Sequence, residues 1–194
     1  MAPGATPVGR EGGSQLQVPT CARTLVTFGA LVNQPSEETQ ESPLHIAAKH
    51  GLKEHVDLYL RNGATVDMKN SLEETPLGVA CREAKEEAKQ ESFLRVCRLL
   101  IKYGAEVNSE DEEMKTPLHK ACKNAHHSLV LLLLQSQADV SAVDYNGASP
   151  LSCVLQTAAF KKELRPHRTI QTLLNHGSPK IWPTAFVKVS SFAV

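Results

Sequence analysis

Apolar and polar residues recur along this chain with a helical period inside a longer repeat. Four segments begin with Ser or Thr followed by Pro and Leu, at residues 42–48, 75–81, 116–122 and 149–155. Their starts are 33, 41 and 33 residues apart. After each segment comes a second apolar stretch with a pair of residues four apart: Val56/Leu60, Cys97/Ile101, Val130/Leu134 and Ile170/Leu174. This spacing places each pair on one helix face, so the pattern predicts four pairs of helices with a buried stripe in each second helix.

Local signals fix where these helices start and stop. Ser or Thr is a preferred N-cap, and Pro fits the first helical position because its missing N–H costs nothing there. Gly63, Gly104 and Gly177 stand where a helix end favours positive φ, and Gln137 takes that place in the third unit. One helix pair cannot bury its apolar face alone, so the units must stack. We therefore predict an all-α solenoid of stacked helix pairs with hairpin-like finger loops between them.

The repeat spacing also divides the chain. The distance from cap to turn is 21, 29, 21 and 28 residues, which indicates insertions in the second and fourth units. The predicted parts are a disordered Gly/Pro-rich arm (1–20), a partial repeat (21–41), four repeats (42–74, 75–115, 116–148 and 149–178) and a C-terminal tail (179–194). Trp182 in the tail is expected to cap the fourth repeat.

The repeated motif resembles that of the ankyrin repeat family. Its T-P-L-H-x-A pattern recurs over residues 42–178, and the fourth copy departs from it at Ser152, Val154 and Leu155. The resemblance implies an ankyrin-repeat solenoid that binds other proteins through its fingers and the adjacent ends of its first helices. The half-repeat at 23–33 resembles a second helix and its turn.

A finer resemblance concerns the order of the repeats. The segments GLKEHVDLYLRNGATVD, RVCRLLIKYGAEVN, TPLHKACKNAHHSLV and NHGSPKIWPTAFVKV resemble the C-terminal repeats of ankyrin repeat and SOCS box proteins. That resemblance implies substrate recognition for a cullin–elongin ubiquitin ligase, in intracellular signalling and protein ubiquitination. We expect the SOCS box, which would recruit elongins and the cullin after Val189, to be absent from this chain, and Leu16 with Cys21 is too widely spaced to replace it. We expect this chain not to bind them. The alternative is a stand-alone scaffold, or a truncated form, that binds a partner without recruiting the ligase.

The composition of the chain limits the kinds of partner that we expect it to bind. The formal net charge is zero, which gives no electrostatic case for nucleic acid or a membrane surface. The longest strongly apolar run, residues 129–134, is far too short to span a bilayer. Five scattered cysteines without C-x-x-C and without a signal peptide are typical of reduced thiols, so we expect a cytoplasmic protein.

Candidate chemistry is sparse. His119, Cys122 and His126 have a spacing that would suit zinc, but His119 is the repeat histidine, as is His45, and Cys122 occupies a small-residue helix position. We favour the structural interpretation and expect no metal or other cofactor. No nucleophile elbow or phosphate-binding loop is present, so we expect no enzyme activity. The pair at 126–127 is expected to lie exposed in a turn.

Partner contacts are expected at the fingers (68–74, 109–115 and 142–148) and at the ends of the first helices. The acidic second finger could match a basic partner segment or serve only solubility. Likewise, the charged segment 82–91 is expected to extend the first helix and its loop, or to contact the partner. The predicted protein-binding residues are Lys49, His50, Lys69, Ser71, Leu72, Glu74, Arg82, Glu83, Glu110, Glu112, Glu113, Lys115, Lys123, Asn124, Val143, Tyr145 and Asn146.

Overall fold

The computed structural model describes residues 20–160 and 166–179, and this part of the chain is helical without a strand. The helices are α1 (Thr20–Thr27), α2 (Pro43–Lys49), α3 (Lys53–Arg61), α4 (Pro76–Glu83), η1 (Glu87–Lys89), α5 (Gln90–Lys102), α6 (Pro117–Lys123), α7 (His127–Gln135), α8 (Pro150–Phe160) and α9 (Pro166–Asn175). The all-α prediction is confirmed.

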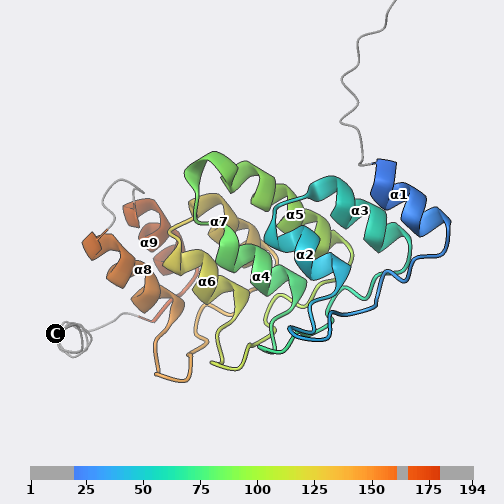
Figure 1. Ribbon diagram of the computed structural model, residues 1–194. Coiled ribbons are helices and arrows are strands. Elements are labelled where there is room, and N and C mark those ends of the chain that lie inside the picture. The colour runs from blue at the N-terminus through green and yellow to red at the C-terminus, as the bar shows by residue number, and fades with distance from the viewer. Residues whose placement is uncertain (1–19, 161–165, 180–194) are drawn as a thin grey trace, which may run out of the picture.

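Two rows of helices form the stack (Figure 1). The first helices pack in chain order, α2 on α4, α4 on α6 and α6 on α8, and each packs on the second helix of its own repeat. The second helices α3, α5, α7 and α9 form the other row. In Figure 1, α1 is drawn at the start of this row, before α3. The fingers project together along the lower edge in Figure 1, so loops that are far apart in sequence become one continuous surface.

The predicted caps are present. Ser42, Thr75 and Thr116 have extended backbone and precede a proline at the first helical position. Gly63, Gly104 and Gly177 adopt φ of +83°, +88° and +85° at the helix ends. Gln137 takes the same place with φ +68°, a conformation that glycine would adopt without a steric penalty.

The core is a set of columns that run through the repeats. One column joins Leu44, Leu77, Leu118 and Leu151 of the first helices, all buried. The matching column of second helices holds Tyr59, Leu100, Leu133 and Leu173, of which only Tyr59 is partly exposed. The prediction that Leu174 is buried is wrong, because it is 39% exposed, while Thr169 and Leu173 face the core of the fourth repeat instead.

The insertion in the second repeat lies elsewhere than expected. Helix α4 ends at Glu83, and the added residues form η1 and the start of α5, which has 13 residues against 9 in α3 and α7. The first helix is therefore not extended, although residues 85–89 are exposed as predicted. In the fourth repeat the insertion does lengthen the first helix, and α8 has 11 residues.

Several predictions concern residues beyond the described ranges. The disordered arm up to residue 19, the second part of the fourth-repeat insertion (161–165), and the tail with Trp182 all fall there. At the described N-terminal end, α1 and its turn leave Leu25, Phe28 and Leu31 largely exposed. Asn33 joins this segment to the first repeat, since its amide donates to the Gly63 carbonyl and accepts from the Thr65 N–H.

The cysteines belong mainly to the core. Cys81, Cys97, Cys122 and Cys153 are buried free thiols, whereas Cys21 is exposed. Burial raises the pKa of Cys122 well above its usual value and that of Cys153 to about 11. Buried protonated thiols act as small apolar side chains, which fits the place of Cys81 and Cys122 on the small-residue face of the first helices.

Candidate protein-binding surface

The shape of each finger depends on one Asn or Asp side chain. Asn70, Asp111 and Asp144 stand five residues before the Thr or Ser that starts the next repeat. In each case Oδ1 accepts hydrogen bonds from the backbone N–H groups two and four residues later, at 2.9–3.0 Å. Such side-chain turns fix the backbone without using the residues at the tip. The hairpin-like fingers predicted from the repeat therefore rest on these three residues.

Neighbouring fingers are joined through their backbones. The N–H of Ser71 donates to the Thr39 carbonyl, that of Glu112 to Leu72 and that of Tyr145 to Glu113, at 2.9–3.2 Å. These bonds run from one repeat to the next at the tips. They hold four loops in a fixed relative position, so the tips form one ridge.

The repeat histidines link each first helix to the finger that follows it. Nδ1 of His45 and of His119 accepts from the backbone N–H of the cap residue, which leaves Nε2 protonated. Each Nε2–H then donates across 29 residues, to the carbonyl of Glu74 or Ala148, at 3.0 Å. Burial lowers the pKa of both rings, despite these hydrogen bonds to carbonyls.

The prediction of an exposed turn at His126–His127 is wrong for His126. Its side chain is buried and caps α7, accepting from the Leu129 N–H through Nδ1 and donating to the Gln90 carbonyl through Nε2. The acceptor comes from the inserted segment, which explains why His126 is covered. Burial again lowers the pKa of this ring.

These histidines should make folding sensitive to mild acid. The unfolded chain takes up a proton at each histidine near pH 6.5, while the folded rings stay neutral to lower pH. We expect the free energy of unfolding to fall between pH 7 and pH 5, by up to about 1.4 kcal/mol per pH unit for each such group. Urea unfolding at three pH values would measure this. His119→Gln should flatten the slope, and equal stability of the wild-type protein at pH 7 and pH 5 would contradict the idea.

The hydrogen bonds of the His119 and His126 rings also concern the possible zinc site that these two residues would form with Cys122. Both nitrogens of each ring already have backbone partners. Within residues 20–160 and 166–179, no group of three His, Cys, Asp or Glu side chains is placed to hold a metal ion.

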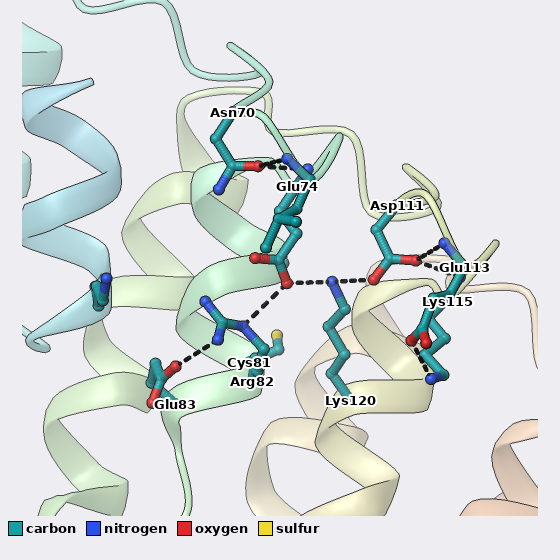
Figure 2. Close-up of polar contacts among 12 residues, drawn as sticks. Asn70, Glu74, Cys81, Arg82, Glu83, Asp111, Glu113, Lys115 and Lys120 are labelled. Carbon is teal, nitrogen blue, oxygen red and sulfur yellow. Dashed lines mark hydrogen bonds and ion pairs between the residues drawn. The ribbon is translucent and has the colours of Figure 1, made fainter. Parts of the chain in front are cut away.

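A buried ion-pair network lies beneath the second finger (Figure 2). Lys120 is 7% exposed, and its Nζ is 2.7 Å from Glu74 Oε1 and 2.8 Å from Asp111 Oδ2. Arg82 approaches the same Glu74 oxygen at 3.0 Å and contacts Glu83 at 2.9 Å. Lys120 thus joins two successive fingers through charge, in addition to their backbone bond.

The small residue Gly78 and the lowered pKa of Asp111 explain how the ion-pair network fits into this buried site. Gly78 replaces the repeat histidine in the second repeat, and a Cβ there would lie 3.4 Å from the ammonium of Lys120. Burial tends to raise the pKa of Asp111, but hydrogen bonds from Lys120 and from backbone N–H groups outweigh it and hold that pKa below its usual value. Asp111 is therefore a charged partner of Lys120 at neutral pH.

The predicted binding residues differ in exposure. Those exposed are His50, Lys69, Ser71, Leu72, Glu110, Glu112, Glu113, Lys123, Val143, Tyr145 and Asn146. Those half-buried are Lys49, Arg82, Glu83 and Lys115. Glu74 and Asn124 are buried, and the Asn124 amide donates to the carbonyls of Cys81 and Arg82.

A cavity of about 280 Å³ brings many of these residues together between the second finger and the ends of α4 and α6. The predicted residues that line it are Leu72, Glu74, Arg82, Glu112, Glu113, Lys115, Lys123 and Asn124. Lys49, His50 and the residues of the third finger are not part of this wall. The cavity has an acidic rim at the finger and basic side chains at the helix ends.

The prediction missed Lys85, Asp111, His119, Lys120 and Cys153 of the same wall. A signal for Lys120 was present, because its position holds Ile46, Val79 and Cys153 in the other repeats. A lysine in an otherwise apolar column indicates a buried charge that requires a partner. Likewise, an Asn or Asp five residues before three of the caps marks the finger turns.

Across the described ranges, no helix combines the length and the apolar character that crossing a bilayer requires.

Stacked helix pairs with aligned fingers define this protein as a helical repeat solenoid. Residues 15–111, 44–144 and 86–181 match the family model described as ankyrin repeats (3 copies). The chain belongs to the ankyrin repeat family, as its motif predicted.

Comparison with individual proteins shows which members of the ankyrin repeat family this chain is similar to. The chain is 50% identical over 169 residues to ankyrin repeat and SOCS box protein 18 of Homo sapiens, a match that covers 87% of this chain and 36% of that protein. It is 34% identical over 207 residues to ankyrin repeat and SOCS box protein 16 of Mus musculus, covering 90% and 46%. It is 39% identical over 174 residues to ankyrin repeat and SOCS box protein 10 of Mus musculus, covering 87% and 37%. The chain spans less than half the length of these relatives, and the resemblance predicted from the order of its repeats is confirmed.

Proposed function

We propose that this chain recognises a protein substrate for a cullin–elongin ubiquitin ligase, in intracellular signalling and in the cytoplasm. The observation that carries the proposal is the ridge of aligned fingers beside the cavity. Its tips present exposed side chains on a backbone fixed by hydrogen bonds, a preorganised surface that loses little entropy on binding. The names of the relatives include a SOCS box, which in this family implies recruitment of elongins and a cullin. The role is one of binding, not of catalysis.

The test compares three baits, each comprising residues 1–194, by proximity biotinylation in intact cells. The first is the wild-type chain, and the second carries Tyr145→Ala with Glu112→Lys at the ridge. The third carries Leu174→Ala with Glu87→Lys, which changes the charge equally and also truncates an exposed apolar side chain, but away from the ridge. We expect a set of labelled proteins that the ridge variant loses by about tenfold and the third bait retains. Identical labelling by all three baits would refute binding through the ridge.

Ubiquitin transfer needs a second measurement. The measurement is a pull-down with this chain and with the same chain extended by a SOCS box. We expect the chain alone to capture its ridge-dependent partners without elongins, and the extended chain to capture the same partners in ubiquitinated form. If neither chain captures a protein that becomes ubiquitinated, the ligase role fails and the scaffold that binds without delivering is supported.

A further inference from the structure

The finger tips carry apolar side chains that the repeat core does not use. Leu72, Met114, Val143 and Tyr145 are all exposed, and Tyr145 is 79% accessible. Leu72 and Tyr145 flank the second finger, because the Glu112 N–H donates to Leu72 and the Tyr145 N–H to Glu113. The apolar tips therefore alternate with acidic residues along one fixed ridge.

The ridge is strongly acidic although the chain as a whole is neutral. The four fingers (34–41, 68–74, 109–115 and 142–148) contain ten carboxylates and two lysines, against a net charge of zero for the chain. Three of these carboxylates are paired with cations of the first helices: Glu41 with Lys49, Glu74 with Arg82 and Lys120, and Asp111 with Lys120. Both lysines are already engaged: Lys69 contacts Glu73 and the Glu110 carbonyl, and Lys115 contacts Glu113. In the described part of the chain, the carboxylates of Glu110 and Glu112 have no ion-pair partner. This field repels phosphates and acidic segments.

The wall of the cavity contains a buried hydrogen-bond acceptor, which is a second observation independent of the charge on the ridge. Glu74 lines the cavity with its side chain 3% exposed, and Oε1 carries both contacts of the network. Its Oε2 is buried and has no hydrogen-bond partner among the described protein atoms. A buried carboxylate oxygen without a donor is costly, so an N–H or O–H group that reached Oε2 would be stabilised there.

We propose that the ridge binds an extended basic segment of a partner protein that also carries apolar side chains. Lysine or arginine side chains of the segment face Glu110, Glu112 and Glu113, and its apolar side chains pack on Leu72 and Tyr145. A donor of the segment enters the cavity towards Glu74. This inference rests on the proposed function, because it specifies the chemistry of the protein that the ridge recognises.

The probe is a random dodecapeptide library displayed on phage and selected on residues 1–194 at about physiological salt. We expect enriched peptides with at least two Lys or Arg and an aromatic or aliphatic residue. One enriched peptide is then synthesised and titrated against variants by fluorescence anisotropy. Glu110→Lys with Glu112→Lys should weaken binding by more than about tenfold, and Tyr145→Ala by about three- to tenfold.

The matched control is Glu86→Lys with Glu87→Lys, which changes the net charge identically. These residues are exposed beside η1, on the edge of the stack opposite the fingers (Figure 1), so affinity should change by less than about twofold. Circular dichroism checks that every variant keeps its helices.

Three outcomes would overturn the inference: enrichment of acidic or uncharged peptides, equal weakening by the two double variants, or no enrichment. The proposed function fails separately, when no cellular partner depends on the ridge. A ridge-dependent partner that binds through an acidic or folded surface would leave the function standing and reject the basic segment.

Discussion

Replacing Lys120 with alanine is expected to lower the free energy of unfolding by about 3–5 kcal/mol. The substitution removes the cation between Glu74 and Asp111 and leaves two carboxylates in a poorly hydrated site. Loss of one partner of a buried ion pair costs more than loss of an exposed pair, because the remaining charge stays desolvated. Chemical denaturation at pH 7 would measure the change. The exposed Lys123, on the same helix, has no ion pair within the described residues, and Lys123→Ala should change stability by less than about 0.5 kcal/mol.

The pH dependence separates this electrostatic cause from lost packing. Because the pKa of Asp111 is lowered in the folded state, its stabilising effect is present above the unfolded value of about 3.9. It is lost as the pH falls through the lower folded value. The difference between wild type and Lys120→Ala should therefore be largest near neutrality and shrink below pH 4. A difference that is constant from pH 7 to pH 3 would attribute the loss to packing alone.

Truncating Leu133 to alanine is the second large effect, expected to lower the free energy of unfolding by about 3–5 kcal/mol. Leu133 is fully buried on α7, which packs between α5 and α9 as well as on α6. The cavity left behind therefore weakens the contacts of one repeat with both of its neighbours. Thermal and urea unfolding would measure the change.

A matched substitution one repeat further on tests the nearest-neighbour argument. Leu174→Ala removes the same number of atoms from a helix of the same row, but this side chain is 39% exposed. Its cost should be below about 1 kcal/mol. Equal costs at the two positions would contradict a stack in which each repeat is stabilised chiefly by its neighbours.

Much of the fold could be read from the sequence because its determinants are local. The N-caps at Ser42, Thr75 and Thr116 and the turn at Gly104 act within a few residues of themselves. The repeat then carries these local signals through the whole chain. The fingers could be located for the same reason, since they are the segments between one turn and the next cap.

The remaining features depend on contacts between repeats, which one sequence does not show. Burial of His126 requires the inserted segment to fold over it, and the insertion extends α5 where an extension of α4 was expected. The pairing of Lys120 with Glu74 joins residues 46 positions apart. Leu174 is exposed, contrary to the prediction, because the neighbouring Leu173 forms the core of the terminal repeat.

The anchoring of the fingers by Asn70, Asp111 and Asp144 has a consequence for how such a surface can change over time. The Oδ1 atoms of these anchors accept from backbone N–H groups and not from tip side chains, so the identity of the tip side chains hardly affects folding. Mutations at Leu72, Glu112 or Tyr145 can then alter what is recognised while the scaffold keeps its stability. Selection for a new partner and selection for a folded chain act on different residues, which leaves the ridge free to diversify rapidly among duplicated copies.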